Sequence, residues 1–268
     1  MQSFININRF INSLNNCYRW WLAILLAFAS INCYAALEGT IIPHPGKYEL
    51  VYFGVQQTDP PVFTIKAHYK YFHMFADVVF PSTVAVIPSI QSVFLLEHSK
   101  INPNEEVLDI GTGIGIQAIF AAEIARRVVA TDISPDAVRN AQFNVKNHQV
   151  EDKVEVRLGD LFAPIKPKEI FDVILFNIDY PYDEKTQGLW SVHQRFFDNV
   201  GHYLKSGGRI YYQAGLIKNI PKIQKMVKNN KLRIMKMDMV SALGVSKSQH
   251  REPIVFLIQR DPALGLSN

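Results

Sequence analysis

The feature that most restricts the fold of this 268-residue chain is an apolar run that ends in closely spaced glycines. Val107–Ile110 has the composition of a buried strand, and Ile116–Ala125 has the apolar spacing of a helix. Between them glycines occupy alternate positions, at Gly111, Gly113 and Gly115. Such glycines let the backbone turn tightly and approach a ligand, and the first amides of a helix lack partners within it. The segment therefore predicts a strand, a binding turn and a helix.

The chain around this turn alternates between short apolar runs and helical segments. Runs of five or six residues occur at Glu106–Ile110, Arg127–Thr131, Val154–Leu158, Phe171–Phe176 and Arg209–Gln213. Runs of this length, separated by crossover helices, are typical of buried parallel strands. A helix predicted at Pro221–Asn229 precedes two strand-like segments, Leu232–Val240 and Pro253–Ile258. We therefore expect an α/β fold with a mostly parallel sheet, preceded at residues 36–83 by a short strand-rich extension or lid.

The first 35 residues have the order of an export signal. Residues 1–19 carry only positive charge, Trp20–Ile31 is an uncharged apolar run, and the following residues have small side chains at Cys33 and Ala35, as a cleavage site does. This order predicts that residues 1–35 are a signal peptide, or a membrane anchor through residues 20–37 if it stays uncleaved. A buried N-terminal core helix is the alternative. We therefore expect an exported protein, periplasmic or secreted, or a membrane-anchored one, with a cytoplasmic location as the alternative.

Charge and composition narrow the partners of the remaining chain. After residue 35 the chain holds 26 basic and 24 acidic residues, so its charge does not support a nucleic-acid partner. Both cysteines, Cys17 and Cys33, lie in the leader, and the rest of the chain can form no internal disulfide and no thiolate metal site. The histidines, His193 among them, show no metal-ligand spacing and are expected at the surface or on helices. We predict no metal.

Three acids lie near the predicted carboxyl ends of successive strands. Asp132 follows Gly111 by 21 positions, where an acid can accept hydrogen bonds from ribose hydroxyls. Asp160 follows the third strand, beside the expected adenine pocket, although Gly-Asp is also a common turn pair. A dinucleotide fingerprint needs a glycine where Ile116 stands, and the charge of Asp109 would repel a phosphate. A cofactor with an amino group and a sulfonium fits better.

Several of these segments resemble one known family of enzymes. The matching segments are Asp109–Gly115, Thr131–Val138, Asn140–Ala141, Asn144, Gly159–Asp160 and Leu204–Ile210. They resemble class I S-adenosylmethionine-dependent methyltransferases, nearest to the methyltransferase small domain group, which includes protein-glutamine N5 and guanine N2 methyltransferases. The resemblance extends from about Phe80 to Ile258. It implies that residues 84–268 form a Rossmann-like methyltransferase domain with a seven-stranded, mostly parallel sheet whose last strand is antiparallel.

The resemblance also implies the cofactor, S-adenosylmethionine, and the residues that hold it. In the family the cofactor lies over the glycine loop, the acid of the second strand holds the ribose, and the acid of the third strand contacts the adenine. The cofactor-binding residues implied in this chain are Asp109, Gly111, Thr112, Gly113, Gly115, Asp132, Ile133, Asp160, Leu161 and Asn177. Among them, Ile133 would pack against the adenine ring.

The loop after the fourth strand is expected to meet the acceptor of the methyl group. In amino-methylating relatives it reads Asn-Pro-Pro-Tyr, where the asparagine and a backbone carbonyl accept from the substrate amino group. Here Asn177 and Tyr180 keep the outer places, and Ile178 and Asp179 replace the prolines. Asn177, Asp179 and Tyr180 are the predicted catalytic residues. Asp179 would act as a base or hold a cationic amine, or else cap its loop, and Tyr180 would line the pocket or simply pack.

The resemblance implies an enzyme that transfers a methyl group from S-adenosylmethionine to a nitrogen or oxygen of its acceptor. The acceptor stays open among a protein, a nucleic acid and a small molecule, because the loop departs from the family pattern. The alternative is a catalytically inactive module of the same fold that binds the cofactor or a partner. A nucleotide-dependent oxidoreductase is disfavoured by the missing glycine.

Overall fold

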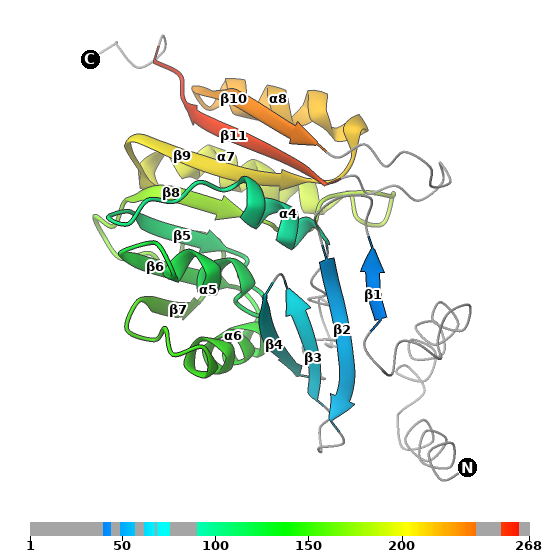
Figure 1. Ribbon diagram of the computed structural model, residues 1–268. Helices are drawn as coiled ribbons and strands as arrows, with labels where there is room; N and C mark the ends of the chain where they lie inside the picture. The colour runs from blue at the N-terminus through cyan, green and yellow to red at the C-terminus, as the bar shows by residue number, and fades with distance from the viewer. Residues whose placement is uncertain are drawn as a thin grey trace.

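The computed structural model of the protein describes residues 40–43, 49–56, 62–67, 69–75, 90–239 and 253–262. Within these residues the chain forms a seven-stranded sheet flanked by helices and a separate four-stranded sheet near the N-terminus (Figure 1). The leader predicted at residues 1–35 lies outside the described residues, as does the part of the predicted lid at residues 76–83.

The seven-stranded sheet has the order β10-β11-β9-β8-β5-β6-β7. Its strands are β5 (Glu106–Ile110), β6 (Arg127–Asp132), β7 (Val154–Leu158), β8 (Phe171–Phe176), β9 (Leu204–Ala214), β10 (Leu232–Met239) and β11 (Ile254–Arg260). The five strands β5 to β9 pair in parallel, and the last strand, β11, pairs antiparallel with both β9 and β10. The predicted fold class, a mostly parallel seven-stranded sheet with its last strand antiparallel, is confirmed.

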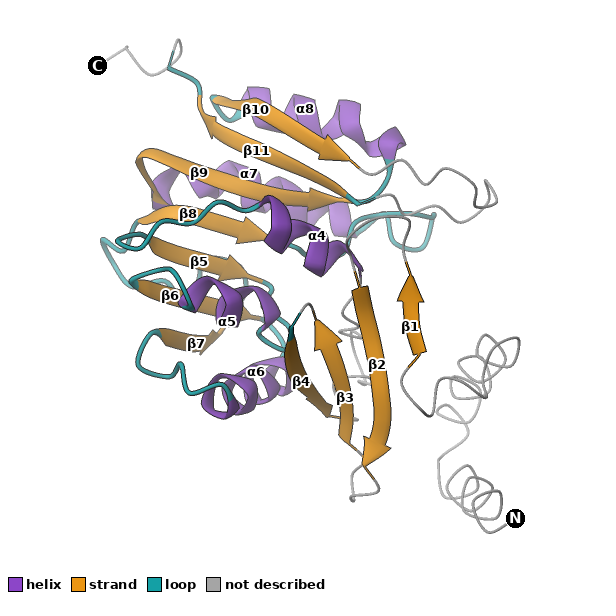
Figure 2. Ribbon diagram, viewed as in Figure 1, coloured by secondary structure: helices purple, strands orange, loops and turns teal. Residues whose placement is uncertain are grey.

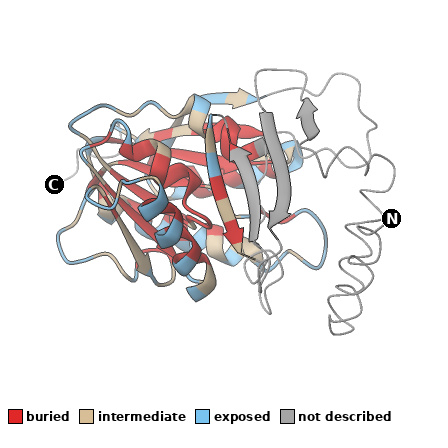
Figure 3. Cartoon of the chain, turned by 60° about the horizontal axis from the view of Figure 1, so that its bottom comes forward, coloured by how far each residue is buried: buried red, intermediate tan, exposed pale blue. Residues whose placement is uncertain are grey.

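Helices cover both faces of this sheet because its central strands are apolar on both sides. On β5, Val107 packs in one core and Leu108 in the other, as the alternation of side chains along a strand requires. Figure 2 shows α4, α5 and α6 on one face and α7 and α8 on the other. Their bounds are α4 (Ile90–His98), α5 (Ile116–Ala122), α6 (Pro135–Asn147), α7 (Leu189–Tyr203) and α8 (Ile220–Asn229). Figure 3 shows buried residues concentrated along the strands and the helix faces that meet them.

The N-terminal strands form an antiparallel meander in the order β1-β2-β3-β4. Their bounds are β1 (Thr40–Pro43), β2 (Glu49–Gln56), β3 (Val62–Ala67) and β4 (Lys70–Phe75). Strand β2 contacts α4 and strand β4 contacts α6. The carboxyl ends of β5 and β8 point toward the side on which this sheet lies (Figure 1). The N-terminal sheet therefore flanks the edge at which an open α/β sheet binds its ligands.

Two asparagines of α6 pair with the outer edge of β4 as a neighbouring strand would. Asn140 accepts from the amide of Phe75 at 2.8 Å and donates to the carbonyl of His73 at 2.8 Å. Asn144, one turn later, accepts from the amide of His73 at 2.9 Å and donates to the same carbonyl at 2.8 Å. Both side chains are fully buried. The spacing of four residues places them on one helix face, so the helix satisfies a strand edge that would otherwise be unpaired.

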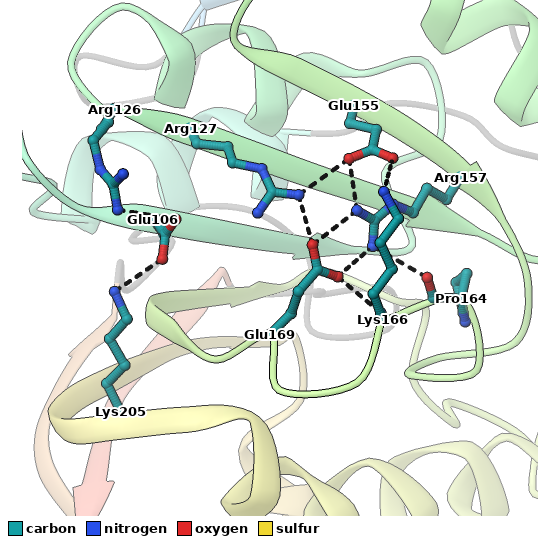
Figure 4. A network of polar contacts seen from close by, with 9 residues as sticks. All are labelled: Glu106, Arg126, Arg127, Glu155, Arg157, Pro164, Lys166, Glu169 and Lys205. Carbon is teal, nitrogen blue, oxygen red and sulfur yellow. Dashed lines mark hydrogen bonds and ion pairs between the residues drawn. The ribbon is translucent and has the colours of Figure 1, made fainter.

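An ion-pair network lies on β6 and on β7, the edge strand of the main sheet next to it (Figure 4). Glu169, in the connection before β8, binds Arg127 at 2.6 Å and Arg157 at 2.6 Å. Glu155 completes the network through Arg157 at 2.6 Å and Lys166 at 2.9 Å. Hydrogen bonds from Arg157 hold the pKa of Glu155 at about 2, and they hold the pKa of Glu169 well below its usual range.

The network should contribute stability that depends on pH. Replacing Glu169→Gln should lower the free energy of unfolding at pH 7 by about 2 kcal/mol, because two part-buried arginine contacts lose their charged acceptor. A lowered carboxyl pKa stabilises the fold above the unfolded value near 4.5, and this contribution is lost as pH falls through the folded value. Urea denaturation of both proteins at pH 7 and pH 2 measures the difference.

The exposed Glu151→Gln is the matched control, since Glu151 is not part of the network. Equal stability of Glu169→Gln and the unmodified protein at pH 7 would contradict the assignment, as would a difference that does not shrink at pH 2.

Candidate active site

The glycine turn between β5 and α5 has a backbone that only glycine adopts without strain. Gly111, Gly113 and Gly115 have φ angles of +73°, +58° and +91°, all in the left-handed region. A Cβ on Gly111 would lie 2.5 Å from Cγ1 of Ile178, so this position also has no room for a side chain. The amides of Gly111 and Thr112 donate to the carbonyl of Thr131, at 2.8 Å and 3.0 Å. The turn thus lies against both the end of β6 and the loop after β8.

Asp132 binds this turn from the end of β6. One carboxylate oxygen accepts from the amide of Gly113 at 2.9 Å, and the other accepts from the amide of Ser134 at 2.9 Å. Burial raises the pKa of Asp132, while these backbone donors act in the opposite direction. The carboxylate therefore lies at the mouth of the turn and is oriented by two amides.

Asp109 lies beneath the turn. Its side chain is 1% exposed and accepts from the hydroxyl of Thr112 at 2.6 Å. Burial, with a smaller contribution from the nearby charge of Asp132, raises the pKa of Asp109 to about 7. In this position Asp109 supports the turn from below, whereas the sequence suggested direct attraction of a cationic ligand group.

The predicted adenine-side residues lie at the ends of β6 and β7. Ile133 is 64% exposed, although it follows a buried strand. Asp160 forms an ion pair with Arg195 of α7. Leu161 is buried with a φ of +48°, and its carbonyl accepts from the Thr131 hydroxyl at 3.3 Å. An exposed apolar side chain beside a carboxylate is an arrangement that can meet a flat polar ring.

The loop after β8 places its first two residues beside the glycine turn. The amide nitrogen of Asn177 donates to the hydroxyl of Ser92 on α4 at 3.1 Å, and Ile178 packs over Gly111. Asp179 is exposed and accepts from the amide of the next residue, Tyr180, at 3.1 Å.

Tyr180 is the predicted catalytic residue that the structure places away from the surface. Its side chain is 2% exposed, and its hydroxyl accepts from the amide of Gln91 at 2.5 Å. The same hydroxyl fills the space where Gly215 lacks a side chain. In this arrangement the ring forms the floor of the loop and presents no open face to a substrate.

His193 is a buried residue that the sequence analysis placed at the surface or on a helix. It lies on α7 and is fully buried. Nε2 lies 3.0 Å from the carbonyl of Asp179, and Nδ1 lies 2.5 Å from the hydroxyl of Tyr212. A carbonyl only accepts, so Nε2 carries the proton and Nδ1 accepts from the tyrosine. Burial lowers the pKa of His193 to about 4, and the neutral ring holds the loop onto the sheet.

The spacing on α7 could have located this histidine. His193, Phe196, Phe197 and Val200 follow one another at intervals of three, one and three residues, which places them on one helix face. That face is the buried one.

The fold and the site define a class of protein: a Rossmann-like α/β domain with a glycine turn and an acid at the carboxyl ends of its first two parallel strands. The sequence profile of the methyltransferase small domain family matches residues 89–236, which is more than half of the chain. The chain belongs to this family.

Individual relatives are similar over part of their length. The chain is 41% identical over 105 residues to a release factor glutamine methyltransferase of Koribacter versatilis, covering 37% of each chain. It is 33% identical over 156 residues to a ribosomal protein L11 methyltransferase of Caldicellulosiruptor bescii, covering 58% of this chain and 44% of the relative. The chain thus spans less than half the length of these two relatives.

Solved structures show the same fold at low sequence identity. A transferase described as putative, from Pyrococcus horikoshii, superposes with a TM-score of 0.55 at 17% identity, covering 77% of this chain and 72% of that chain. The ribosomal protein L11 methylase of Lactobacillus delbrueckii subsp. bulgaricus gives 0.50 at 21% identity, covering 64% and 77%.

The comparisons correct the predicted location of the protein. Export or membrane anchoring is wrong as a prediction for this chain, because its relatives are named for a release factor and a ribosomal protein, which are components of protein synthesis. Among the residues that the structure describes, no helix has the length and apolar composition needed to cross a membrane. Those residues also contain no group of three or more metal-ligating side chains.

The buried carboxyl of Asp109 should make stability fall as pH rises through neutrality. Its folded pKa of about 7 lies above the unfolded value of 3.8, so the contribution is present below 3.8 and lost as pH rises through 7. Between pH 5 and pH 7 the loss should be about 2 kcal/mol in the free energy of unfolding. Asp109→Asn has no proton to lose, so it should lack this part of the pH dependence.

Denaturant titrations of both proteins at pH 5, 6, 7 and 8 measure the difference between them, which cancels the other titrating groups. A constant difference across this range would show that Asp109 titrates elsewhere.

Asn144 and Asn140 form a natural test pair for coupling between the N-terminal sheet and the glycine turn. Only Asn144 also donates to the carbonyl of Ile114 in the turn, at 2.9 Å. Both Asn140→Ala and Asn144→Ala should speed amide hydrogen exchange in β4, because each leaves a strand amide unpaired. Only Asn144→Ala should also speed exchange at Gly113 and Gly115. Equal effects of the two variants on the turn would show that β4 alone supports it.

Proposed function

We propose that the protein is an S-adenosylmethionine-dependent methyltransferase that acts on a nitrogen of a protein side chain. The observation that carries this proposal is the contact between Ile178 and Gly111. It brings Asn177, the first residue of the acceptor loop, beside the turn expected to hold the methyl donor. A binding turn and an acceptor loop held in contact are what a transfer reaction requires.

The residues present fit the methyl donor. The open backbone of the glycine turn can approach the ligand closely, since no side chain fills it. Asp132 offers carboxylate oxygens for the ribose hydroxyls, and exposed Ile133 offers an apolar surface for the adenine. Asp160 and the backbone of Leu161, at the end of β7, would contact the adenine at its edge. S-adenosylmethionine, when bound, supplies a methyl group activated by its positively charged sulfur.

The protein then has little acid-base chemistry to perform. The lone pair of the acceptor nitrogen forms the new bond to the methyl carbon, the carbon–sulfur bond breaks, and its electron pair remains on sulfur. The acceptor nitrogen loses one proton, either to water or to the exposed carboxylate of Asp179. Asn177 orients the acceptor through its carbonyl oxygen, because its amide nitrogen is bonded to Ser92. His193 and buried Tyr180 hold the loop in place.

A protein acceptor is supported by the relatives and by the charge of the chain. The relatives are named for methylation of a release factor and of ribosomal protein L11. The slight excess of basic residues after residue 35 gives no support to nucleic acid. These observations favour a side-chain nitrogen of a protein.

The proposal is tested with the full chain, S-adenosylmethionine labelled in its methyl group, and a bacterial release factor and ribosomal protein L11 as acceptors. We expect label in at least one acceptor, reduced about 100-fold in Asn177→Ala, because a positioning contact at the reacting nitrogen is lost. Asn177 is also one of the implied cofactor-binding residues, so binding of S-adenosylhomocysteine to the variant is measured in parallel, and its affinity should fall much less than the rate of transfer. Cofactor binding without transfer to either acceptor would instead favour an inactive module.

A further inference from the structure

Gln213 carries a buried oxygen that has no hydrogen-bond partner. Its side chain is 1% exposed, and its amide nitrogen donates to the carbonyl of Ala214 at 2.6 Å. The other amide atom, Oε1, is buried without a partner. Because the carbonyl of Ala214 only accepts, reversing the amide would place two oxygens together, so the orientation is fixed. The unpaired atom is therefore an acceptor.

Along the sheet, Gln213 lies at the same position as Asn177, the first residue of the loop after β8. Phe176 of β8 pairs with Tyr212 of β9, so Asn177 and Gln213 are the next residues along two neighbouring parallel strands. Neighbouring strands lie about 4.8 Å apart, which is within reach of one small chemical group.

Both side chains extend to the same face of the sheet. Tyr212 and Ala214 belong to the core beneath α7 and α8, and side chains alternate along a strand, so Gln213 faces the opposite way, toward α4. Tyr211, which shares that orientation, packs in the core with α4. Asn177 also reaches α4, through its bond to Ser92. Two amide side chains thus meet on one face at the carboxyl ends of β8 and β9.

Burying an unpaired acceptor costs free energy, and most buried polar atoms in proteins are paired. A leucine or methionine would fill the same space without that cost. We propose that Gln213 is a specificity determinant, whose Oε1 accepts an N–H of the acceptor nitrogen beside the oxygen of Asn177. This inference rests on the proposed methyl transfer and adds a residue to it.

The side-chain oxygens of Asn177 and Gln213 determine which chemical group can serve as the methyl acceptor. A nitrogen with two N–H groups satisfies both oxygens and keeps its lone pair for the methyl carbon. A hydroxyl has one hydrogen to donate and can bond to only one of the two oxygens. An amide nitrogen that already carries one methyl group also has only one hydrogen left to donate. The site therefore discriminates against oxygen acceptors, and it stops after one methyl group.

The test compares Gln213→Leu and Gln213→Met with Gln117→Leu in the full chain. Gln117 is a buried glutamine whose amide nitrogen donates to the carbonyl of Ser92, as that of Gln213 donates to the carbonyl of Ala214, but Gln117 has no unpaired buried atom. Both substitutions therefore remove one donated hydrogen bond, and only those at Gln213 also remove an unpaired acceptor. The two Gln213 variants should lower the midpoint of urea unfolding clearly less than Gln117→Leu does, because removing the unpaired acceptor offsets the lost hydrogen bond to Ala214. S-adenosylhomocysteine affinity should stay within about twofold in the Gln213 variants.

With the release factor or ribosomal protein L11 acceptor, whichever is labelled, KM should rise about tenfold or more in the Gln213 variants, with a smaller change in kcat. Mass spectrometry of the product should show a single added methyl group. A fall in stability like that of Gln117→Leu would show that Oε1 is already satisfied within the protein, and would overturn the inference. An unchanged KM would overturn it while the proposed function stands. No transfer by the unmodified protein would overturn both.

Discussion

The glycine turn after β5 depends on side chains from other elements to hold its shape. Its three glycines have left-handed backbones, and within it the amide of Gly115 donates to the carbonyl of Thr112. Thr112, within the turn, is bonded to Asp109 below it, and Gly113 is bonded to Asp132 of β6. Asn144 of α6 binds Ile114. The turn is preorganised because strand ends and a helix converge on it, which is the property a binding site for a flexible ligand needs.

The same contacts make the N-terminal sheet part of the site's support. Asn144 bonds at once to β4 and to the turn, so a displacement of the sheet would be transmitted to the turn through one side chain. The loop after β8 is held in a similar way from the other face of the sheet. There His193 of α7 bonds to the carbonyl of Asp179 in the loop and to the hydroxyl of Tyr212 in the core. Both functional loops are therefore held by buried polar side chains at the margins of two apolar cores. Such bonds fix orientation more narrowly than apolar contacts do.

The sequence predicts the main sheet well because its strands are buried on both faces and appear as continuous apolar runs. β5, β7 and β8 begin and end where the sequence analysis placed them. β9 begins five residues earlier than expected, at Leu204, because Lys205 to Gly208 resemble a turn and not a strand. For residues 36–83 the sequence predicted only a strand-rich extension or lid, whereas in the structure strands β1 to β4 form an antiparallel meander. The predicted exported or membrane-anchored location was wrong, because local charge and hydropathy do not report what the domain does.

The site residues also fall into those that local sequence predicts and those that it does not. The glycines and Asp132 follow from local spacing, since a turn at a strand end imposes them. The burial of Tyr180, the pairing of Asp160 with Arg195 and the unpaired oxygen of Gln213 depend on contacts between distant segments. No local pattern carries that information. His193 is intermediate, because its helix face is visible in the sequence while its two partners are not.

The most direct test of this account is calorimetric titration of the full chain with S-adenosylmethionine and, separately, with NAD. The account predicts one binding site for S-adenosylmethionine with a Kd in the micromolar range, at least about tenfold weaker binding in Asp132→Asn, and no binding of NAD. Binding of NAD in preference to S-adenosylmethionine, or a folded protein that binds neither, would contradict the assignment of the glycine turn and Asp132 to a methyl donor.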